Sequence, residues 1–384
     1  MTLYPNLILD ALKNVRYPGN GKNIVELGMV EDDIRIDGNT VSFSLIFDKP
    51  TDPFVRSVVR AAETALTTYI SPDVDVKGRI AVKFRKEPEK KPELLPGVKH
   101  IIGVSSGKGG VGKSTVAANL AVALAAKGYR VGLLDADIFG PSMPKMFGVE
   151  DEQIYMVNEE GRDWIEPIER YGVKMLSIGF LVDKEKPVLW RGGMASNALK
   201  QLIGDAWWGD LDYFLIDMPP GTSDIHLTLV QTLPISGVVV VTTPQEVALA
   251  DARKGVAMFT DPKVNVPVLG IVENMAWFTP EPHPSEKYYI FGEGGGKALA
   301  EKMGVRLLAQ IPLVMGIREH ADAGAPVALQ LEGCPKSEDM ADSGEICPNP
   351  EAEAFGKLAE EVVAAVGARD EQLPPTLKVE VTKR

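Results

Sequence analysis

The chain has 384 residues, of which 45% are hydrophobic and 24% charged, values typical of a globular protein large enough for two domains. Its 41 basic and 53 acidic residues give a net charge of −12, which argues against general nucleic-acid binding. No apolar run approaches the roughly 20 residues that span a bilayer, and the first ten residues lack the pattern of a signal peptide. The only two cysteines, Cys334 and Cys347, suit a reducing compartment, so we expect a cytoplasmic protein. From the charge and the absence of a long apolar run, we expect it to bind neither nucleic acid nor membranes.

Residues 1–84 are predicted to form a small α/β domain. Apolar residues at near-helical spacing predict a helix over 53–69, and alternating residues predict strands around the turn D-G-N at 37–39. The elements expected in chain order are a helix at 7–12, strands at 33–36 and 40–47, the helix at 53–69 and a strand at 75–82. Residues 85–97 are charged and proline-bearing and predict a linker.

From residue 98 to residue 368, apolar β-branched runs alternate with helical segments. This alternation predicts a mostly parallel sheet with helices on both faces. We expect strands at 98–104, 131–134, 213–216, 237–242 and 268–272, and helices at 115–127, 225–233, 247–259, 297–302 and 352–366. A polar loop at 332–350 holds both cysteines, and residues 369–384 are expected to form a loosely held tail.

Residues 107–115 have the sequence G-K-G-G-V-G-K-S-T and fit the phosphate-binding pattern G-x-x-x-x-G-K-[ST]. They lie between a predicted strand and a predicted helix, where backbone N–H groups form a nest for a polyphosphate. Lys113 is expected to reach the terminal phosphates and Ser114 to ligate Mg²⁺. The residues expected to bind the nucleotide here are Gly107, Lys108, Gly109, Gly110, Val111, Gly112, Lys113, Ser114 and Thr115.

Two acidic positions are expected to complete the site. The strand Y-F-L-I-D at 213–217 ends in Asp217, which would face the phosphate loop and hold Mg²⁺ through a water. The stiff turn P-P-G-T that follows it suits a switch that senses the γ-phosphate. Asp135 and Asp137 follow another strand; a helix cap or a turn residue is the alternative for each of these aspartates.

Lys108, the first lysine of the phosphate loop, narrows the class of nucleotide-binding protein. The string G-K-G-G-V-G-K-S resembles the deviant Walker A motif of the MinD/ParA/nitrogenase-iron-protein/arsenite-pump ATPases. The resemblance implies an ATP-dependent homodimer in which Lys108 reaches across to the partner's nucleotide; the alternative is a solvated lysine in a turn. It further implies that Asp137 orients the attacking water, making Lys108, Lys113 and Asp137 the catalytic residues, and that Asn274 binds the adenine edge.

Further strings along residues 98–330 resemble the Mrp/ApbC subgroup of these ATPases. They are D-A-D-I-F-G-P-S (135–142), W-R-G-G-M (190–194), D-M-P-P-G-T-S-D (217–224), V-V-T-T-P-Q-E-V-A-L-A-D (240–251), E-N-M-A-W-F (273–278) and I-F-G-E-G-G-G (290–296). The N-terminal domain is similar to the small iron–sulfur-assembly domain of bacterial members, chiefly at V-E-L-G-M-V (25–30). The resemblance implies an ATP-hydrolysing carrier or assembly factor that passes iron–sulfur clusters to apoproteins.

The sequence departs from that subgroup at its cluster ligands. Pro280 and His283 occupy the positions of the subgroup's C-x-x-C pair, and Asp52 precedes Pro53 where relatives have a cysteine. Thiolates are the usual ligands of iron–sulfur clusters, so a cluster bridged by that pair is excluded.

Three interpretations stay open at this point. The chain is a cluster carrier with relocated ligands, for which Cys334 and Cys347 are the candidates and His283 a weaker one. Alternatively, it assists cluster assembly by docking partners without holding metal. As a third alternative, it is a MinD/ParA-type positioning ATPase, which predicts a basic DNA-binding face or an amphipathic membrane helix.

Overall fold

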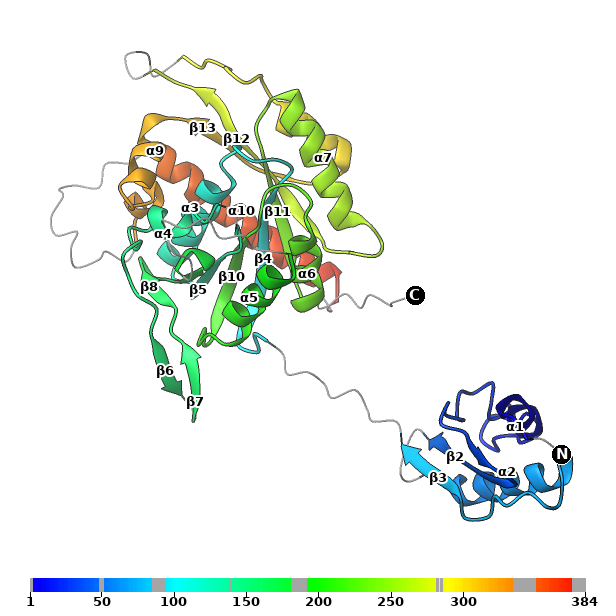
Figure 1. Cartoon of the computed structure of the whole chain (residues 1–384). Coiled ribbons are helices and arrows are strands. Elements are labelled where there is room, and N and C mark those ends of the chain that lie inside the picture. The colour runs from blue at the N-terminus through cyan, green and yellow to red at the C-terminus, as the bar shows by residue number, and fades with distance from the viewer. Residues whose placement is uncertain are drawn as a thin grey trace. The chain divides into compact units, whose positions relative to one another are not determined.

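The structure, a computed structural model, describes residues 3–47, 52–84, 94–138, 140–159, 161–180, 192–280, 283, 286–333 and 350–374. The chain divides into two compact units, residues 1–92 and 93–384 (Figure 1). Each unit has its own hydrophobic core, so each is described by itself.

The N-terminal unit is a three-stranded sheet packed against two helices. Strand β2 (Thr40–Phe47) is central, antiparallel to β1 (Arg35–Asp37) and parallel to β3 (Ile80–Phe84). Helices α1 (Pro5–Leu12) and α2 (Val55–Tyr69) bury their apolar faces in one core with the sheet. In α2 the buried residues are Val58, Ala62, Ala65 and Leu66, the spacing that predicted this helix from the sequence.

The second unit is built on an eight-stranded sheet in the order β13-β12-β11-β4-β10-β5-β9-β8. Every neighbouring pair is parallel except β8 with β9, which is antiparallel at one edge. The strands are β4 (Val98–Ser106), β5 (Val131–Asp135), β8 (Ile168–Arg170), β9 (Val173–Ser177), β10 (Leu211–Asp217), β11 (Gly237–Thr242), β12 (Val268–Phe278) and β13 (Leu307–Leu313).

Helices cover both faces of this sheet, as the alternation of elements predicted (Figure 1). Along β10, Tyr213 and Leu215 enter one core while Phe214 and Ile216 enter the other, because successive side chains of a strand point to opposite faces. One core holds α3 (Lys113–Ala126) and α10 (Pro350–Gln372), and the other holds α5 (Gly192–Gly204), α6 (Asp224–Thr232), α7 (Glu246–Thr260) and α8 (Gly295–Met303). The fold class predicted from the sequence is thus confirmed.

The remaining elements are short. A hairpin of β6 (Met156–Glu159) and β7 (Arg162–Ile165) stands apart from the main sheet, and α4 (Met143–Met146) and α9 (Met315–Asp322) lie near each other. Two 3₁₀ turns cover Ile178–Phe180 and Val327–Gln330.

Helix α10 extends beyond the predicted 352–366, so residues 369–372 are helical instead of belonging to a loose tail. Within the described parts of the chain, no helix is both long enough and apolar enough to cross a membrane.

Candidate nucleotide site

The phosphate loop connects the end of β4 at Ser106 to the start of α3 at Lys113. Gly110 and Gly112 both have φ near +81°, a left-handed conformation that favours glycine. A Cβ atom on Gly107 would lie 2.1 Å from the backbone carbonyl carbon of Asp251 in α7. These glycines are therefore required by the path of the backbone, and the loop opens directly onto the first turn of α3.

Lys113, Ser114 and Asp217 form the buried centre of the site. The Lys113 ammonium donates to Asp217 Oδ1 at 2.5 Å, and the Ser114 hydroxyl donates to Asp217 Oδ2 at 2.6 Å. Asp217 is fully buried at the end of β10, the strand next to β4. Burial raises the pKa of the Asp217 carboxyl, and the Lys113 charge and the Ser114 hydrogen bond oppose that rise. The predicted lysine, serine and aspartate are thus brought into direct contact.

Asp135 lies beside Asp217 because the ends of β5 and β10 are in register. It is fully buried and accepts hydrogen bonds from the Ser177 hydroxyl at 3.0 Å and from the Met143 and Asp137 backbone N–H groups at 3.2 Å each. Burial and the neighbouring Asp217 charge raise the pKa of Asp135 to about 7. Asp135 therefore anchors the segment that follows β5, which is the turn-residue alternative that the sequence left open for it.

Asp137 and Lys108 lie at the edge of this centre. Asp137 Oδ2 is 3.8 Å from the Lys113 ammonium, within ion-pair distance. Lys108 is half-exposed in the loop, and its backbone carbonyl accepts from the Ser106 hydroxyl at 2.9 Å. None of the ion pairs among the described residues involves the Lys108 ammonium.

Asn274 is buried within β12, four residues before the strand ends at Phe278, and contacts the phosphate loop. Its Nδ2 donates to the Val111 carbonyl at 2.9 Å and would lie 2.2 Å from a Cβ atom on Gly112. The predicted adenine-binding residue is therefore placed beside the loop, and any side chain at residue 112 would displace it.

Two further residues hold the site together and escaped the sequence analysis. Glu273, fully buried beside Asn274, accepts from the Gly296 backbone N–H at 3.0 Å and from Gln310 Nε2 at 2.6 Å. It thereby fixes the glycine-rich start of α8 to the strand that carries Asn274. The only signal was its position inside E-N-M-A-W-F.

His226 caps the helix that follows the switch turn. Its Nδ1 accepts the Ser223 backbone N–H at 3.2 Å, and its Nε2 lies 3.5 Å from the Ser105 hydroxyl of β4. Burial lowers the pKa of His226 to about 4, so the imidazole is neutral near pH 7. A histidine three residues after a serine is a weak sequence signal, since glutamate or glutamine is the usual partner in this cap.

The residues that occupy the positions of the missing cluster ligands make other contacts. Asp52 accepts from the Tyr17 hydroxyl at 2.6 Å and from the Phe54 backbone N–H at 2.7 Å, so it forms an Asx turn that precedes α2. His283 is exposed and lies 3.8 Å from Glu286. Cys334 and Cys347 fall outside the described residues. Among the residues that the structure does describe, no group of three or more His, Cys, Asp or Glu side chains could hold a metal ion.

The donor set at the loop fits magnesium. Ser114 Oγ and an Asp217 oxygen lie 2.6 Å apart at the start of α3, and both are hard oxygen donors of the kind that Mg²⁺ prefers. Together with the loop, this arrangement defines a nucleotide-binding P-loop NTPase.

Comparison with known families places the chain more closely. Residues 97–345 match the ParA family, described as NUBPL iron-transfer P-loop NTPase, and residues 6–77 match the iron-sulfur cluster assembly protein family. The chain belongs to this family of iron–sulfur cluster carrier P-loop NTPases, with an iron–sulfur assembly domain at its N-terminal side. The resemblance seen in the sequence is confirmed.

Individual relatives agree with this assignment. An iron-sulfur cluster carrier protein of Synechocystis sp. is 44% identical over 332 residues, which cover 85% of this chain and 92% of the relative. One from Aquifex aeolicus is 42% identical over 341 residues, covering 84% and 91%. A solved structure, a nucleotide-binding protein of Archaeoglobus fulgidus in complex with ADP, is 40% identical with a TM-score of 0.53, covering 60% of this chain and 89% of its own.

Proposed function

We propose that this protein is a homodimeric Mg²⁺-dependent ATPase of the cytosol that delivers iron–sulfur clusters to apoproteins or assists their assembly. The observation that carries the proposal is the buried contact of Lys113 and Ser114 with Asp217 at the mouth of the phosphate loop. These are the groups that bind and neutralise a transferring phosphoryl group in P-loop enzymes.

The chain's own residues account for the steps of binding and hydrolysis. The backbone N–H groups of Gly107–Thr115 would cradle the phosphates, and Lys113 would exchange its contact with Asp217 for one with the terminal phosphates. Ser114 directly, and Asp217 through water, would hold Mg²⁺, which when bound neutralises phosphate charge. Asp137, at the edge of the site, would orient the attacking water. Asn274 would contact the adenine edge from β12.

A dimer is supported by the surface around the loop. Helices that follow parallel strands begin at the carboxyl edge of the sheet, where the phosphate loop lies. Leu227, Val247 and Met315 lie in the first turns of α6, α7 and α9, and all three are exposed; Val247 and Met315 are 67% and 63% exposed. Burial of these side chains against a second copy would form a symmetric interface at this edge of the sheet, from which we propose that the Lys108 of each copy reaches the nucleotide of the other.

The cluster is the cargo of the proposed reaction. Since Pro280 cannot ligate iron and Asp52 is engaged in the turn before α2, thiolates at Cys334 and Cys347 are the proposed ligands, two from each protomer. If these cysteines hold nothing, the proposed role becomes assistance to assembly by docking partners.

Phosphate release from ATP tests the catalytic assignment. We expect Lys113→Ala to lower the rate at least about 100-fold and Lys108→Ala at least about 10-fold, since each removes charge stabilisation in phosphoryl transfer. Lys127→Ala, at the far end of α3 where Lys127 pairs with Glu360 at 2.7 Å, is the matched control and should keep the rate. Lys108→Ala and Lys113→Ala variants that both hydrolyse ATP at the wild-type rate would refute the assignment.

Light scattering and reconstitution test the other two parts. A non-hydrolysable ATP analogue should double the mass of the wild type and leave Lys108→Ala less dimeric; an unchanged monomer would contradict the role of Lys108 across the interface. Anaerobic reconstitution with iron and sulfide should give a visible chromophore that the Cys334→Ser, Cys347→Ser double variant lacks. A chromophore retained by that variant would refute the cysteine ligands.

A further inference from the structure

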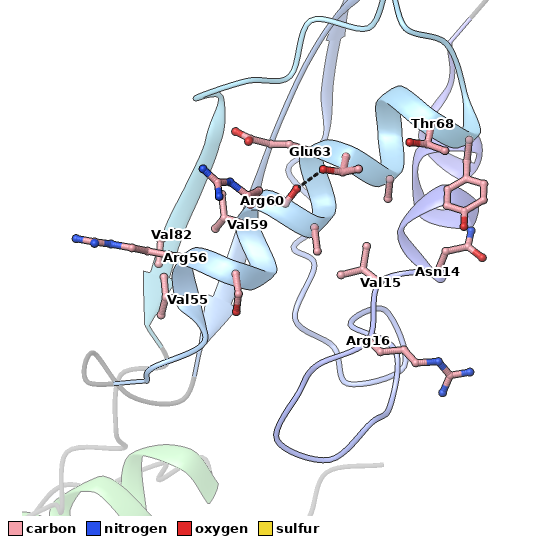
Figure 2. Close-up of a pocket in the computed structure, with 15 residues that line it drawn as sticks. Asn14, Val15, Arg16, Val55, Arg56, Val59, Arg60, Glu63, Thr68 and Val82 are labelled. Atoms are coloured by element: carbon pink, nitrogen blue, oxygen red, sulfur yellow. Dashed lines mark hydrogen bonds between the residues drawn. The ribbon is translucent and has the colours of Figure 1, made fainter.

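We propose that the N-terminal unit carries a docking groove for an acidic segment of a partner protein. The groove has a volume of about 1100 Å³ and is lined by α2, by the segment that follows α1 and by β3 (Figure 2). All of its lining residues belong to residues 1–92, so the groove is complete within one unit.

Three arginines line the groove. Arg56 and Arg60 project from α2 one helical turn apart, and Arg16 lies at the other end (Figure 2). The Arg16 guanidinium donates to the Gly21 carbonyl at 2.9 Å, which leaves its charge without an acidic partner. None of the ion pairs among the described residues includes Arg56 or Arg60. The groove therefore presents planar cationic donors suited to carboxylates.

The acid in the groove does not neutralise these arginines. Glu63 is the only acidic residue among the lining residues, and its Oε1 accepts the Gly78 backbone N–H at 2.9 Å. Glu63 and Arg60, both described in the structure, form no ion pair with each other, although they lie three residues apart on α2. The net charge of the lining is thus positive.

An apolar strip runs between the arginines. Val15 is buried, Val59 and Val82 are half-buried, and Tyr69 is 61% exposed at one end. A free phosphate would contact the arginines and leave this strip in water. A peptide segment with apolar side chains between its carboxylates would cover both, which is how helices in grooves are commonly recognised.

The distribution of charge along the chain favours an acidic occupant at this unit in particular. The small domain at residues 1–84 is close to neutral, with 10 Lys and Arg against 11 Asp and Glu, whereas residues 93–384 contain 27 against 40. An acidic partner is repelled by the second unit and attracted to the groove, and such complementarity steers encounter and orientation. The N-terminal unit would thus select partners for a chain that is acidic elsewhere.

The full-length protein and a labelled synthetic peptide test the groove. The probe is an amphipathic peptide with glutamates one helical turn apart and leucines between them, and its control has every glutamate replaced by glutamine. Binding is followed by fluorescence anisotropy at about 50 and 500 mM NaCl, where screening differs several-fold. Arg56→Gln with Arg60→Gln is compared with Arg35→Gln and Lys77→Gln, a control pair of exposed cations outside the groove that loses the same charge.

The groove predicts a specific set of results. The acidic peptide binds more weakly at high salt, and the amide peptide binds at least about ten-fold more weakly than the acidic one. The variant pair in the groove loses about ten-fold in affinity for the acidic peptide, while the control pair changes less than two-fold. Arg56→Lys with Arg60→Lys, which keeps the charge, recovers part of the affinity and separates this effect from misfolding. Equal binding of both peptides, or equal losses for both pairs, overturns the proposal. Tighter binding of a single-stranded oligonucleotide of equal charge would overturn it in favour of nucleic acid.

This inference concerns a different unit from the nucleotide site. Peptide binding requires no ATP, so its failure leaves the proposed ATPase intact, and loss of ATP hydrolysis in Lys113→Ala leaves peptide binding intact.

Discussion

Replacing His226 by glutamine should reduce the acid sensitivity of the second unit. The imidazole is buried between Ser223, the N-cap of α6, and Ser105 of β4, and it accepts a backbone N–H through Nδ1. Protonation of Nδ1 would eliminate that acceptor and place a charge near Lys113, which further lowers the pKa of His226. The folded protein therefore resists protonation of this histidine.

The size of the effect follows from linkage between proton binding and folding. The pKa of His226 is about 4 in the folded protein, against 6.5 for an unperturbed histidine. As the pH falls below about 6.5 the unfolded chain takes up a proton that the folded chain does not, so folding stability is lost between about pH 6.5 and 4. At pH 5 the loss is about 2 kcal/mol, because each unit of pKa difference is worth about 1.4 kcal/mol.

Urea unfolding followed by tryptophan fluorescence measures this loss. All five tryptophans lie beyond residue 92, so the signal reports the second unit alone. Between pH 7.5 and 5, the wild type should lose about 2 kcal/mol more than His226→Gln. His283→Gln, which removes an exposed histidine of the same unit, is the matched control and should follow the wild type. Parallel stability curves for wild type and His226→Gln would refute the reasoning.

Three other predictions concern the site and the N-terminal unit. Asp217→Ala should lower the free energy of unfolding by about 3 kcal/mol or more, because it leaves the Lys113 charge buried and unpaired. Adding Lys113→Ala should recover much of that loss in urea unfolding, and strictly additive losses would show that the pair does not interact. Asp52→Ala should destabilise the start of α2 by about 1–2 kcal/mol through the loss of its hydrogen bonds with Tyr17 and Phe54, seen as faster hydrogen exchange over residues 55–69; unchanged exchange would contradict a stabilising role for this turn. Removal of divalent metal by EDTA should abolish ATP hydrolysis and excess Mg²⁺ should restore it, whereas activity that survives EDTA would exclude metal from the reaction.

Much of the second unit was predictable because its strands are buried on both faces. Such strands are continuous apolar runs, and β10 and β11 were found close to their predicted positions for that reason. Hairpin β6–β7 was missed, since each of its short strands has two adjacent apolar residues and two polar ones, all half-buried or exposed, and so shows no apolar alternation. Helix α10 was predicted too short because its last turn, A-R-D-E-Q, is polar.

The nucleotide site likewise contains residues that could be predicted from the sequence and residues that could not. The loop at 107–115 and Asp217 follow from local patterns that specify backbone geometry and chemistry together. Glu273 and His226 could not be found so, because their roles depend on Gln310 and Ser105, which are distant in the chain and adjacent only through the sheet. The hydrogen bond that Asp52 accepts from Tyr17 likewise forms only in the folded unit, because the two residues are distant in the chain.

The contact of Gly107 with α7 gives the phosphate loop a mechanical connection to the outside of the sheet. A Cβ atom at residue 107 would lie 2.1 Å from the Asp251 carbonyl carbon, so the loop packs directly on the α7 backbone with no side chain between them. The contact falls in the second turn of α7, which spans Glu246–Thr260. A change in the path of the loop at Gly107 must therefore be accommodated by the backbone of α7 at Asp251 and Ala252.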